Sequence, residues 1–289
     1  MANTYDADLV TDVLSDIALT TLGSDLTMLN GFSTNVTDER AAARQTIQVE
    51  LVTAAGDAIE NPTNFEVTAA TNTNVAVALT HLSRPVEVSA QDLNQGQRLR
   101  TKATKAIQTI SNAVQDACLS LVTSANYTGD IIELPPTKSA ADYQKFREDL
   151  WAAITGGTPS AVFNKETFSR YLPTNQEGFD ILQGRGFFGF DYMSFSSRFV
   201  AAEAEATMLG FSCDPSAMAI AARLPEDPGA AKDRDYIVSD VITLPVVNLP
   251  LEYNVWFSRA TRSHWMSYDI CFGAAKGDPS ALRIGIQGT

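Results

Sequence analysis

The sequence has 289 residues, 45% of them hydrophobic and 19% charged, which is typical of a folded globular protein and excludes a disordered chain. The formal net charge of −13 disfavours nucleic-acid binding over the whole surface, so any such contact would need a local basic patch. No apolar run reaches the roughly 18 residues of a membrane span, and the first residues lack the features of a secretory signal. Three scattered cysteines, Cys118, Cys213 and Cys271, predict buried thiols in a reducing compartment, without disulfides or a zinc site.

The first 30 residues carry apolar side chains at three- and four-residue steps, which predicts a short amphipathic helix. Residues 1–40 hold seven acids and one base, so they contribute −6 of the net charge. We expect the helix to pack against another element and to lead into a polar arm through Asn35. The alternative is an ordinary N-terminal helix of the core.

Residues 45–88 change to the two-residue period of β-strands. Ile47, Val49 and Leu51 alternate in the first strand, and a long β-like run follows a turn signal at 71–74. Few bulky apolar residues surround the tip of this excursion, so it cannot bury much surface within its own chain. We expect it to lean on a neighbouring molecule.

A long helix is predicted next, because Ser89 and Asp92 form a capping-box pattern. From Asp92 to Thr123 it would be about 48 Å long. Its apolar stripe consists of Leu99, Ala103, Ala106, Ile107, Ile110, Ala113, Val114, Ala117 and Leu121. The basic cluster consists of Arg98, Arg100, Lys102 and Lys105. It indicates a solvated face, a docking face for the acidic N-terminal segment, or a contact at a shell interior or between subunits.

The second half of the chain mixes helical and extended patterns. Residues 139–154 predict a helix ended by two glycines, 160–164 a short buried strand, and 165–172 a helix that stops before Pro173. Apolar alternation over 253–257, 264–268 and 282–286 predicts a β-rich final segment. These patterns together predict an α+β fold.

The sequence contains only weak matches to nucleotide-binding, catalytic or metal-binding motifs. The letters GxGxxG occur at 184–189, but without the strand, helix and distant acid of a dinucleotide site. The two histidines, His81 and His264, are 183 positions apart and have no nucleophile elbow or metal motif beside them. The neighbouring acids Glu226/Asp227 and Asp233/Asp235 lie in an evident loop, where burial would not raise a pKa. We therefore expect no catalytic, cofactor-binding or metal-binding residues and no enzyme activity.

The order of these elements resembles that of the major capsid proteins of tailed bacteriophages, which have the Hong Kong 97-like fold. Residues 75–93 (VAVALTHLSRPVEVSAQDL) look like the family's return strand running into its spine helix. Residues 159–168 (PSAVFNKETF) and 210–220 (GFSCDPSAMAI) resemble strand entries of the A-domain, and 268–273 (YDICFG) resemble the closing strands. The resemblance covers nearly the whole chain and rests on the order and spacing of elements.

The resemblance implies a division of the chain into the family's parts. Residues 1–44 would be the N-terminal arm and 45–85 the extended β-hairpin called the E-loop. Residues 86–125 and 251–289 would form the P-domain, with a spine helix over about 89–123. Residues 126–250 would form the A-domain.

The implied function is self-assembly, through pentamers and hexamers, into the icosahedral head that encloses the phage genome. The implied partners are further copies of the chain, a separate scaffolding protein, a portal, a decoration protein and weakly contacted double-stranded DNA, with no membrane and no cofactor. The location would be the virion, after assembly in the host cytoplasm. Residues 45–85 contain no lysine, so the isopeptide cross-link of some relatives would lack its nucleophile.

Three alternatives remain at this point. An encapsulin-type nanocompartment shares the fold and packages enzymes. A cytoplasmic enzyme with a cryptic site is a different class of protein, and a tail or baseplate component is a third.

Overall fold

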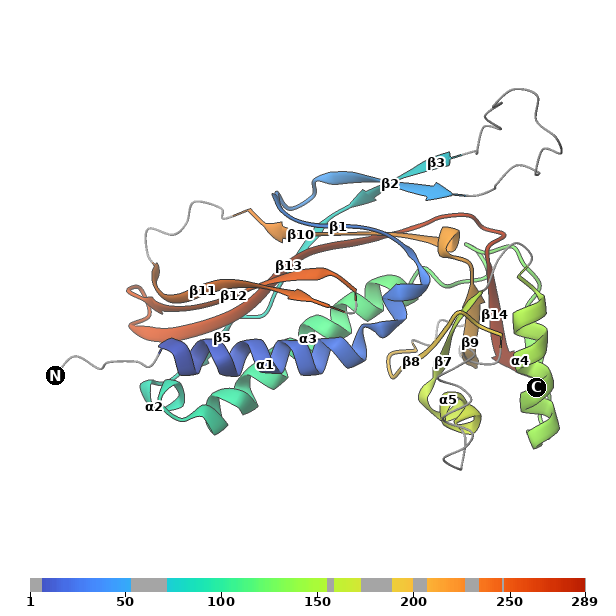
Figure 1. Cartoon of the computed structure of the whole chain (residues 1–289), viewed down its shortest axis with the longest axis horizontal. Coiled ribbons are helices and arrows are strands. Elements are labelled where there is room, and N and C mark those ends of the chain that lie inside the picture. The colour runs from blue at the N-terminus through green and yellow to red at the C-terminus, as the bar shows by residue number, and fades with distance from the viewer. Residues whose placement is uncertain are drawn as a thin grey trace, which may run out of the picture.

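The computed structural model describes residues 7–52, 72–154, 159–172, 189–199, 207–226, 234–245 and 247–288. Several sequence predictions therefore fall outside the described residues. They concern the tip of the β-excursion at 53–71, most of the GxGxxG stretch, Asp227 and Asp233. The described elements form two sheets, a separate two-stranded hairpin and helices packed on them, so the predicted α+β class is confirmed (Figure 1).

The larger sheet contains seven of the described strands. Its main path runs β1-β10-β13-β12-β11, and two short strands, β4 and β5, also pair with β13. The bounds are β1 Ser33–Ala41, β4 Thr80–Ser83, β5 Val86–Val88, β10 Met218–Pro225, β11 Arg234–Leu244, β12 Leu249–Ser258 and β13 Ser263–Lys276. Strands β1 and β10 are parallel, whereas β13 runs antiparallel to each of its neighbours. This sheet joins the N-terminal, central and C-terminal parts of the chain.

Two helices cover one face of the larger sheet. Helix α1 (Ala7–Asp25) and helix α3 (Gly96–Leu119) lie side by side along it (Figure 1). Val10 and Leu22 of α1 and Leu99 and Ile107 of α3 are completely buried against the sheet. The first helix is thus an ordinary helix of the core, which was the alternative interpretation of residues 1–30.

The expected polar arm through Asn35 is wrong. After a short 3₁₀ helix (η1, Thr27–Gly31), the chain enters strand β1, which pairs with β10. Arg223 donates hydrogen bonds to the backbone oxygen and the side-chain oxygen of Asn35, at 2.7 and 2.8 Å, and the Asn35 amide donates to the backbone oxygen of Gln48. Polar residues can lie within a sheet when neighbouring strands supply their partners.

The long helix is interrupted near its start. The capping box of Ser89 and Asp92 is present, but it begins only helix α2 (Ala90–Leu93). Asn94 and Gln95 separate this turn from α3, which ends at Leu119 rather than near residue 123. Gly96 begins α3 where a side chain would touch helix α1, since a Cβ there would lie 3.7 Å from Val13. The spine helix is therefore about 36 Å long.

The smaller sheet contains five of the described strands, in the order β6-β14-β9-β7-β8. Their bounds are β6 Ile132–Leu134, β7 Ser160–Asn164, β8 Tyr192–Ser196, β9 Met208–Cys213 and β14 Leu282–Gln287. Helices α4 (Ala140–Ala152) and α5 (Lys165–Tyr171) pack on it, which confirms the helices predicted at 139–154 and 165–172. Its core contains Phe146, Leu150 and Phe163.

The sheets divide the chain differently from the expected boundaries. Strands β10 and β11, expected in the second unit at 126–250, belong to the larger sheet. Strand β14, expected with the larger sheet, pairs with β9 and β6 in the smaller one. A 3₁₀ turn (η2, Pro215–Ala217) connects β9 to β10, so the chain passes between sheets there. The division at residue 250 therefore does not coincide with the two sheets, because strands pair with partners from the whole chain and not only within a contiguous segment.

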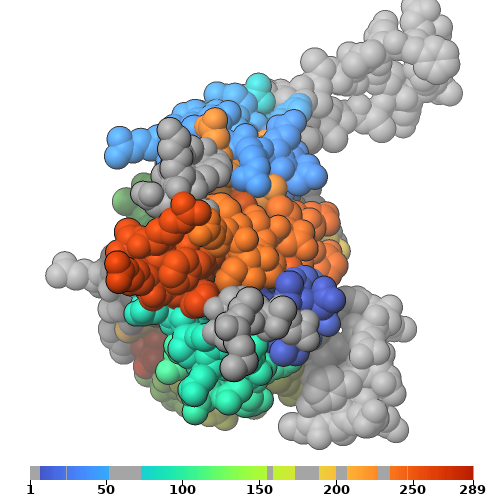
Figure 2. Space-filling view, turned by 90° about the vertical axis from the view of Figure 1, so that its left-hand side faces the viewer, coloured from blue at the N-terminus to red at the C-terminus, as the bar shows by residue number. Residues whose placement is uncertain are grey.

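Strands β2 (Thr46–Val52) and β3 (Asn72–Ala78) form an antiparallel hairpin on the other face of the larger sheet. Figure 2 shows the layers from one end: β1 and the hairpin in light blue, the larger sheet in orange and red, and α2 and α3 in blue-green. The described part of the hairpin leans on its own sheet, through Val49, Leu51 and Val77. The predicted contact with a neighbouring molecule therefore does not concern the described base of the hairpin.

Candidate functional site

The base of the hairpin lies unusually close to strand β13. A Cβ on Gly273 would lie 2.3 Å from the backbone oxygen of Ala78 and 2.8 Å from Val77. The sheet residues beneath the hairpin are equally small, namely Ala219 and Ala221. Only small side chains allow two backbones to approach this closely. The hairpin can thus lie this close to the sheet because the sheet residues beneath it have small side chains or none.

Charged contacts surround this attachment. His81 of β4 binds the Asp269 carboxylate of β13, with Nε2 3.2 Å from Oδ1, and Ser267 donates a further hydrogen bond to Asp269. Burial alone would raise the pKa of Asp269, but hydrogen bonds from His81, Ser267 and Ser83 outweigh it and hold the pKa below its ordinary value. Asp269 is therefore a buried anion that joins the return strand of the hairpin to the sheet.

An ion pair joins the end of β1 to the start of β12 on the same face of the larger sheet. The Arg40 guanidinium donates to the Glu252 carboxylate at 3.0 Å and to the backbone oxygen of Pro225 at 2.7 Å. Glu252 is 8% exposed, whereas the Arg40 side chain is 47% exposed, so the pair is shielded from water on the carboxylate side only. The sheet face that carries the hairpin thus has charged contacts, and the hairpin backbone lies unusually close to it.

His81 and Cys271 are the described pair that most resembles a catalytic nucleophile and base. They lie opposite each other on β4 and β13, and both line a pocket of about 380 Å³. A nucleophilic cysteine needs a lowered pKa, whereas burial and the nearby Asp269 charge raise the pKa of the Cys271 thiol. The thiol donates to the backbone oxygen of Ala41 at 3.6 Å, and the His81 ring binds Asp269. The geometry and the charge therefore favour a structural role for Cys271.

The other candidate groups lie apart from one another or have shifted pKa values. His264 lies seven residues from Cys271 along β13, about 23 Å in extended chain, and burial lowers the pKa of its imidazole. Burial also raises the pKa of the Cys118 thiol to about 12 and raises the pKa of Cys213 further. Asp235 forms an exposed ion pair with Arg259 at 2.6 Å, and Arg259 lowers the pKa of its carboxyl.

Within the described ranges, no group of three or more His, Cys, Asp or Glu side chains is arranged to hold a metal ion. None of the helices that the structure describes is both long enough and apolar enough to cross a membrane.

Two members of the basic cluster bind acids of their own chain. Arg100 donates to Asp16 of α1 at 2.8 Å. Lys102 donates to Asp92 at 2.8 Å and to the backbone oxygen of Glu87 at 2.9 Å. Burial would raise the pKa of Asp92, but hydrogen bonds from Lys102 and Ser89 lower it to about 2. For Arg100, the docking face for the acidic N-terminal segment is therefore confirmed.

Sequence reasoning missed the residues that hold the hairpin, above all Asp269, Glu252 and Gly273. A signal was present, because Glu252 and Asp269 are each an acid within a largely apolar and buried part of its strand. A charge at such a position indicates a buried partner or a functional contact. The partners, Arg40 and His81, lie about 190 to 210 residues away in the chain, so no local pattern identifies them.

Comparison with known proteins gives fold similarity without close sequence similarity. No family model matches the sequence, and no curated protein matches it. A virus-like particle from Pyrococcus furiosus matches 96% of this chain and 98% of its own, with a TM-score of 0.54 and 11% identity.

Matches with TM-scores below 0.5 include two further shell structures. The capsid of an empty GTA particle has a TM-score of 0.49 and 14% identity, over 91% of this chain and 90% of its own. The capsid of Myoviridae phage XM1 has a TM-score of 0.48 and 14% identity, over 92% of each chain. The element order, the two sheets and the whole-chain match to the Pyrococcus particle together establish that the chain has the Hong Kong 97-like fold.

Proposed function

We propose that this chain is a major capsid protein, whose copies self-assemble into the icosahedral head of a tailed phage and enclose its genome. The observation that carries the proposal is the fold match along almost the whole length of both chains to a protein that forms a virus-like particle. The hairpin supports it further. A two-stranded hairpin is marginally stable alone, and β2 and β3 lie as an outer layer on the face of the larger sheet opposite the helices (Figure 1). An outer hairpin layer suits a contact with an adjacent copy.

The two sheets correspond to the parts of a shell subunit. The larger sheet with α1 and α3 would form the P-domain, and the smaller sheet with α4 and α5 the A-domain, whose copies would meet around the five- and six-fold axes. Strands β2 and β3 would be the base of the E-loop. Helix α3 would be a strut, because its buried stripe is fixed along the sheet. Repeated contacts of modest strength would then close the shell by symmetry.

A structural role agrees with the chemistry of the described side chains. The cysteine pKa values are raised, and His81 is held by a buried carboxylate. We therefore propose that the chain catalyses nothing and needs no cofactor. Its partners would be other copies, a scaffolding protein, a portal and a decoration protein. Its location would be the virion, after assembly in the host cytoplasm. The net charge of −13 suits a container that contacts packaged double-stranded DNA only weakly.

Electron microscopy of the purified chain tests this proposal, with and without co-expression of its neighbouring genes. Icosahedral shells, or rings of five and six subunits, are the expected result. A uniformly monomeric or dimeric protein under both conditions would overturn the proposal. The same particles distinguish the two shell functions by their contents, since a phage head packages DNA and an encapsulin-type nanocompartment packages enzymes.

The chemistry of the E-loop predicts a shell without covalent cross-links. Residues 45–85 contain no lysine, so no amine is available there to form an isopeptide bond. Denaturing gels of intact particles should show one band near the monomer mass of 31.2 kDa. A ladder of covalent multimers that survives boiling and reducing agent would contradict this prediction.

A further inference from the structure

The end of helix α3 is joined to the smaller sheet through strand β8. In the described order of that sheet β8 is the last strand, and it contacts η1, which follows α1 (Figure 1). Gln115 and Asp116, near the end of α3, both bind residues at the end of β8 or just after it. The helix whose apolar stripe packs on the larger sheet therefore also holds the smaller one.

A chain of three buried hydrogen bonds crosses this junction. The Ser196 hydroxyl of β8 donates to the side-chain oxygen of Gln115 at 2.6 Å, and the Gln115 amide donates to the Ser111 hydroxyl at 3.1 Å. The Ser111 hydroxyl in turn donates to the Asp25 carboxylate of α1 at 3.3 Å. Ser111, Gln115 and Ser196 are all buried, so these bonds form away from bulk water, where they are stronger.

Both ends of this chain determine its direction. The backbone N–H of Arg198, which can only donate, donates to the Ser196 hydroxyl at 3.0 Å. The Asp25 carboxylate at the other end can only accept. The hydroxyls and the amide between these ends therefore have one favoured orientation. Because hydrogen bonds are directional, the chain holds β8 at one position relative to α1 and α3.

A second contact joins the same two elements. The Arg198 guanidinium donates to both carboxylate oxygens of Asp116, at 3.0 and 2.5 Å, which is a bidentate pair. The two side chains are 40% and 37% exposed, so this pair borders the solvent, unlike the buried chain. We use the name polar latch for the side chains of both contacts, namely Asp25, Ser111, Gln115, Asp116, Ser196 and Arg198.

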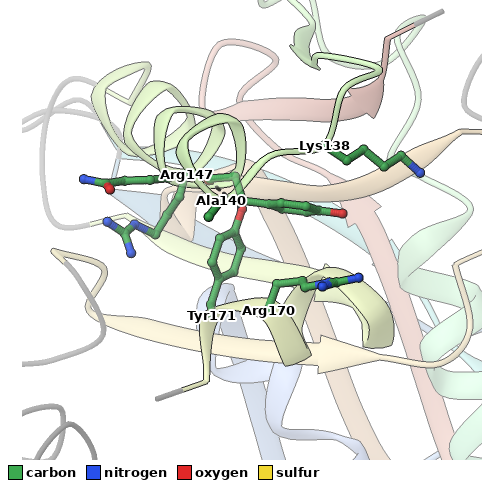
Figure 3. Close-up of a pocket in the computed structure, with 7 residues that line it drawn as sticks. Lys138, Ala140, Arg147, Arg170 and Tyr171 are labelled. Atoms are coloured by element: carbon green, nitrogen blue, oxygen red, sulfur yellow. Dashed lines mark hydrogen bonds between the residues drawn. The ribbon is translucent and has the colours of Figure 1, made fainter. Parts of the chain in front are cut away.

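The smaller sheet and its two helices are fastened to one another. Tyr143 of α4 and Tyr171 of α5 meet edge to face, and the Tyr171 hydroxyl donates to the backbone oxygen of Tyr143 at 3.1 Å. Arg147 and Arg170 extend to opposite sides of the Tyr171 ring, each 5.9 Å from the centre of a tyrosine ring (Figure 3). Ser212 of β9 donates to the backbone of α4 at 2.7 Å. The sheet, α4 and α5 would therefore move together.

Aromatic side chains also join the two parts of the molecule. Phe211 of β9 stacks on Phe32, which follows η1, with ring centres 6.2 Å apart, and the Phe199 ring lies 6.3 Å from Phe211. Apolar attraction holds surfaces together but has no preferred direction. These rings thus keep the two parts in contact, whereas the polar latch selects one angle between them.

We propose that the polar latch sets the angle of the smaller sheet on helix α3, and that its opening lets the smaller sheet turn with α4 and α5 while both cores stay folded. Water reaches the half-exposed pair of Arg198 and Asp116, so opening begins there and then frees Ser196 from Gln115. The polar latch lies within the single chain and does not depend on the capsid function.

Distances between spin labels in the unassembled chain test the proposal. Gln97→Cys on α3 and Ala141→Cys on α4 place the labels at exposed positions, and the native cysteines are buried. The chain without further changes should give one narrow distance distribution by pulsed electron paramagnetic resonance. Gln115→Met keeps the side-chain length but removes both polar groups, so the distribution should widen. Hydrogen exchange at 192–196 should become about tenfold faster, as expected for one lost buried hydrogen bond.

Gln108→Met is the matched control, because it makes the same substitution at an exposed position of α3. A wide distribution in Gln115→Met and a narrow one in Gln108→Met, with both chains folded by circular dichroism, would support the proposal. Ser196→Ala removes the same contact from β8 and decides the question if Gln115→Met does not fold. A folded latch variant whose distribution is as narrow as that of the control would overturn the proposal.

The consequence for assembly rests on the proposed function. A loosened smaller sheet would let subunits meet at varying angles, so particles of Gln115→Met should vary more in diameter than particles of Gln108→Met in electron micrographs. Equal spreads of diameter would overturn a role of the polar latch in assembly. If the unaltered chain forms no particles, the proposed capsid function fails, while the spin-label distances still decide whether the polar latch exists.

Discussion

The two faces of the larger sheet are made by alternate residues of the same strands, yet they are held in opposite ways. On the helix-covered face, β13 presents Tyr268, Ile270 and Phe272, all completely buried under α1 and α3. On the hairpin-covered face, the same strand presents Cys271 and Gly273. The helix face is filled with large apolar side chains, whereas the sheet side chains under the hairpin are small.

The two faces also differ in their polar groups. The helix face has mainly isolated hydrogen bonds to backbone, such as that from the Tyr268 hydroxyl to the backbone oxygen of Leu14 at 3.0 Å. The hairpin face has the hydrogen-bonded pair of His81 and Asp269 and the ion pair of Arg40 with Glu252. Apolar burial supplies most of the free energy of folding, while close fit and charge pairs fix a particular arrangement. We infer that the helix face provides stability and the hairpin face determines where the hairpin lies.

The largest expected effect is on the helix face. Phe272→Ala removes a completely buried ring and should lower the free energy of unfolding by about 3–5 kcal/mol, because a cavity remains under α3. Denaturant unfolding measures this loss. Val241→Ala, at a position 38% exposed on β11, is the control and should cost less than about 1 kcal/mol. Equal losses in the two variants would remove the distinction between the helix face and the surface.

A change at Gly273 tests the hairpin face. Gly273→Val places atoms where the Ala78 backbone now lies, so the hairpin must move away, at a cost of about 1–3 kcal/mol. Hydrogen exchange of residues 72–79 should become faster, and particle assembly should fail while the fold persists. Gly23→Ala in α1 is the matched control, because nothing lies within 4 Å of its Cβ, and it should stabilise the chain by about 0.5–1 kcal/mol. Unchanged exchange in Gly273→Val would refute the close approach.

Acid pH should weaken the hairpin face through Asp269. Its folded pKa is below the unfolded value of about 4, so the carboxylate contributes stability above that pH, and this stability is lost as pH falls through the folded pKa. His81→Ala removes one hydrogen-bond donor and raises the folded pKa, so the loss of stability on acidification should be smaller and should end at a higher pH. Unfolding free energies measured between pH 5 and 2 check this. His264→Ala, five residues from Asp269 along β13, should leave that window unchanged.

The smallest effect is expected outside both faces, in the basic cluster. Arg100 and Asp16 form an exposed ion pair, with side chains 48% and 56% accessible, so Arg100→Ala should cost less than about 0.5 kcal/mol. Lys102→Ala should cost about 1 kcal/mol or more, because it leaves the buried carboxylate of Asp92 without its cation. Thermal unfolding of the two variants side by side measures the difference. The reverse order would indicate that Arg100 has a role beyond α1.

The element types were largely predictable from local patterns. The three- and four-residue steps in the first 30 residues and in 99–114 predict the two helices that cover the sheet, and both are present. The capping box at Ser89 was also predictable, since it involves groups only three residues apart. The length of the spine helix was not predicted, because no local pattern signals the break at Asn94 and Gln95 between α2 and α3.

The same patterns do not predict which strands pair or which elements cover each face of a sheet. Alternation at 253–257 and 264–268 predicts strands with two different faces, but it does not say that helices cover one face and a hairpin the other. The expected division at residue 250 does not follow the sheets, because β11, which precedes it, belongs to the larger sheet, and β14, which follows it, joins β9 in the smaller one. The contact between Gln115 and Ser196 was missed for a related reason, since the two residues lie 81 positions apart in the chain.

Hydrophobic periodicity and capping act over a few residues, so the types of the elements, their order and the resemblance that the fold comparison supports could be read from the amino acids. The register of β13 against its neighbours, the closeness of the hairpin at Gly273 and the pairing of Asp269 with His81 became evident only in the folded chain. Those features depend on groups that are far apart in the chain, and only the folded backbone brings them within reach of each other.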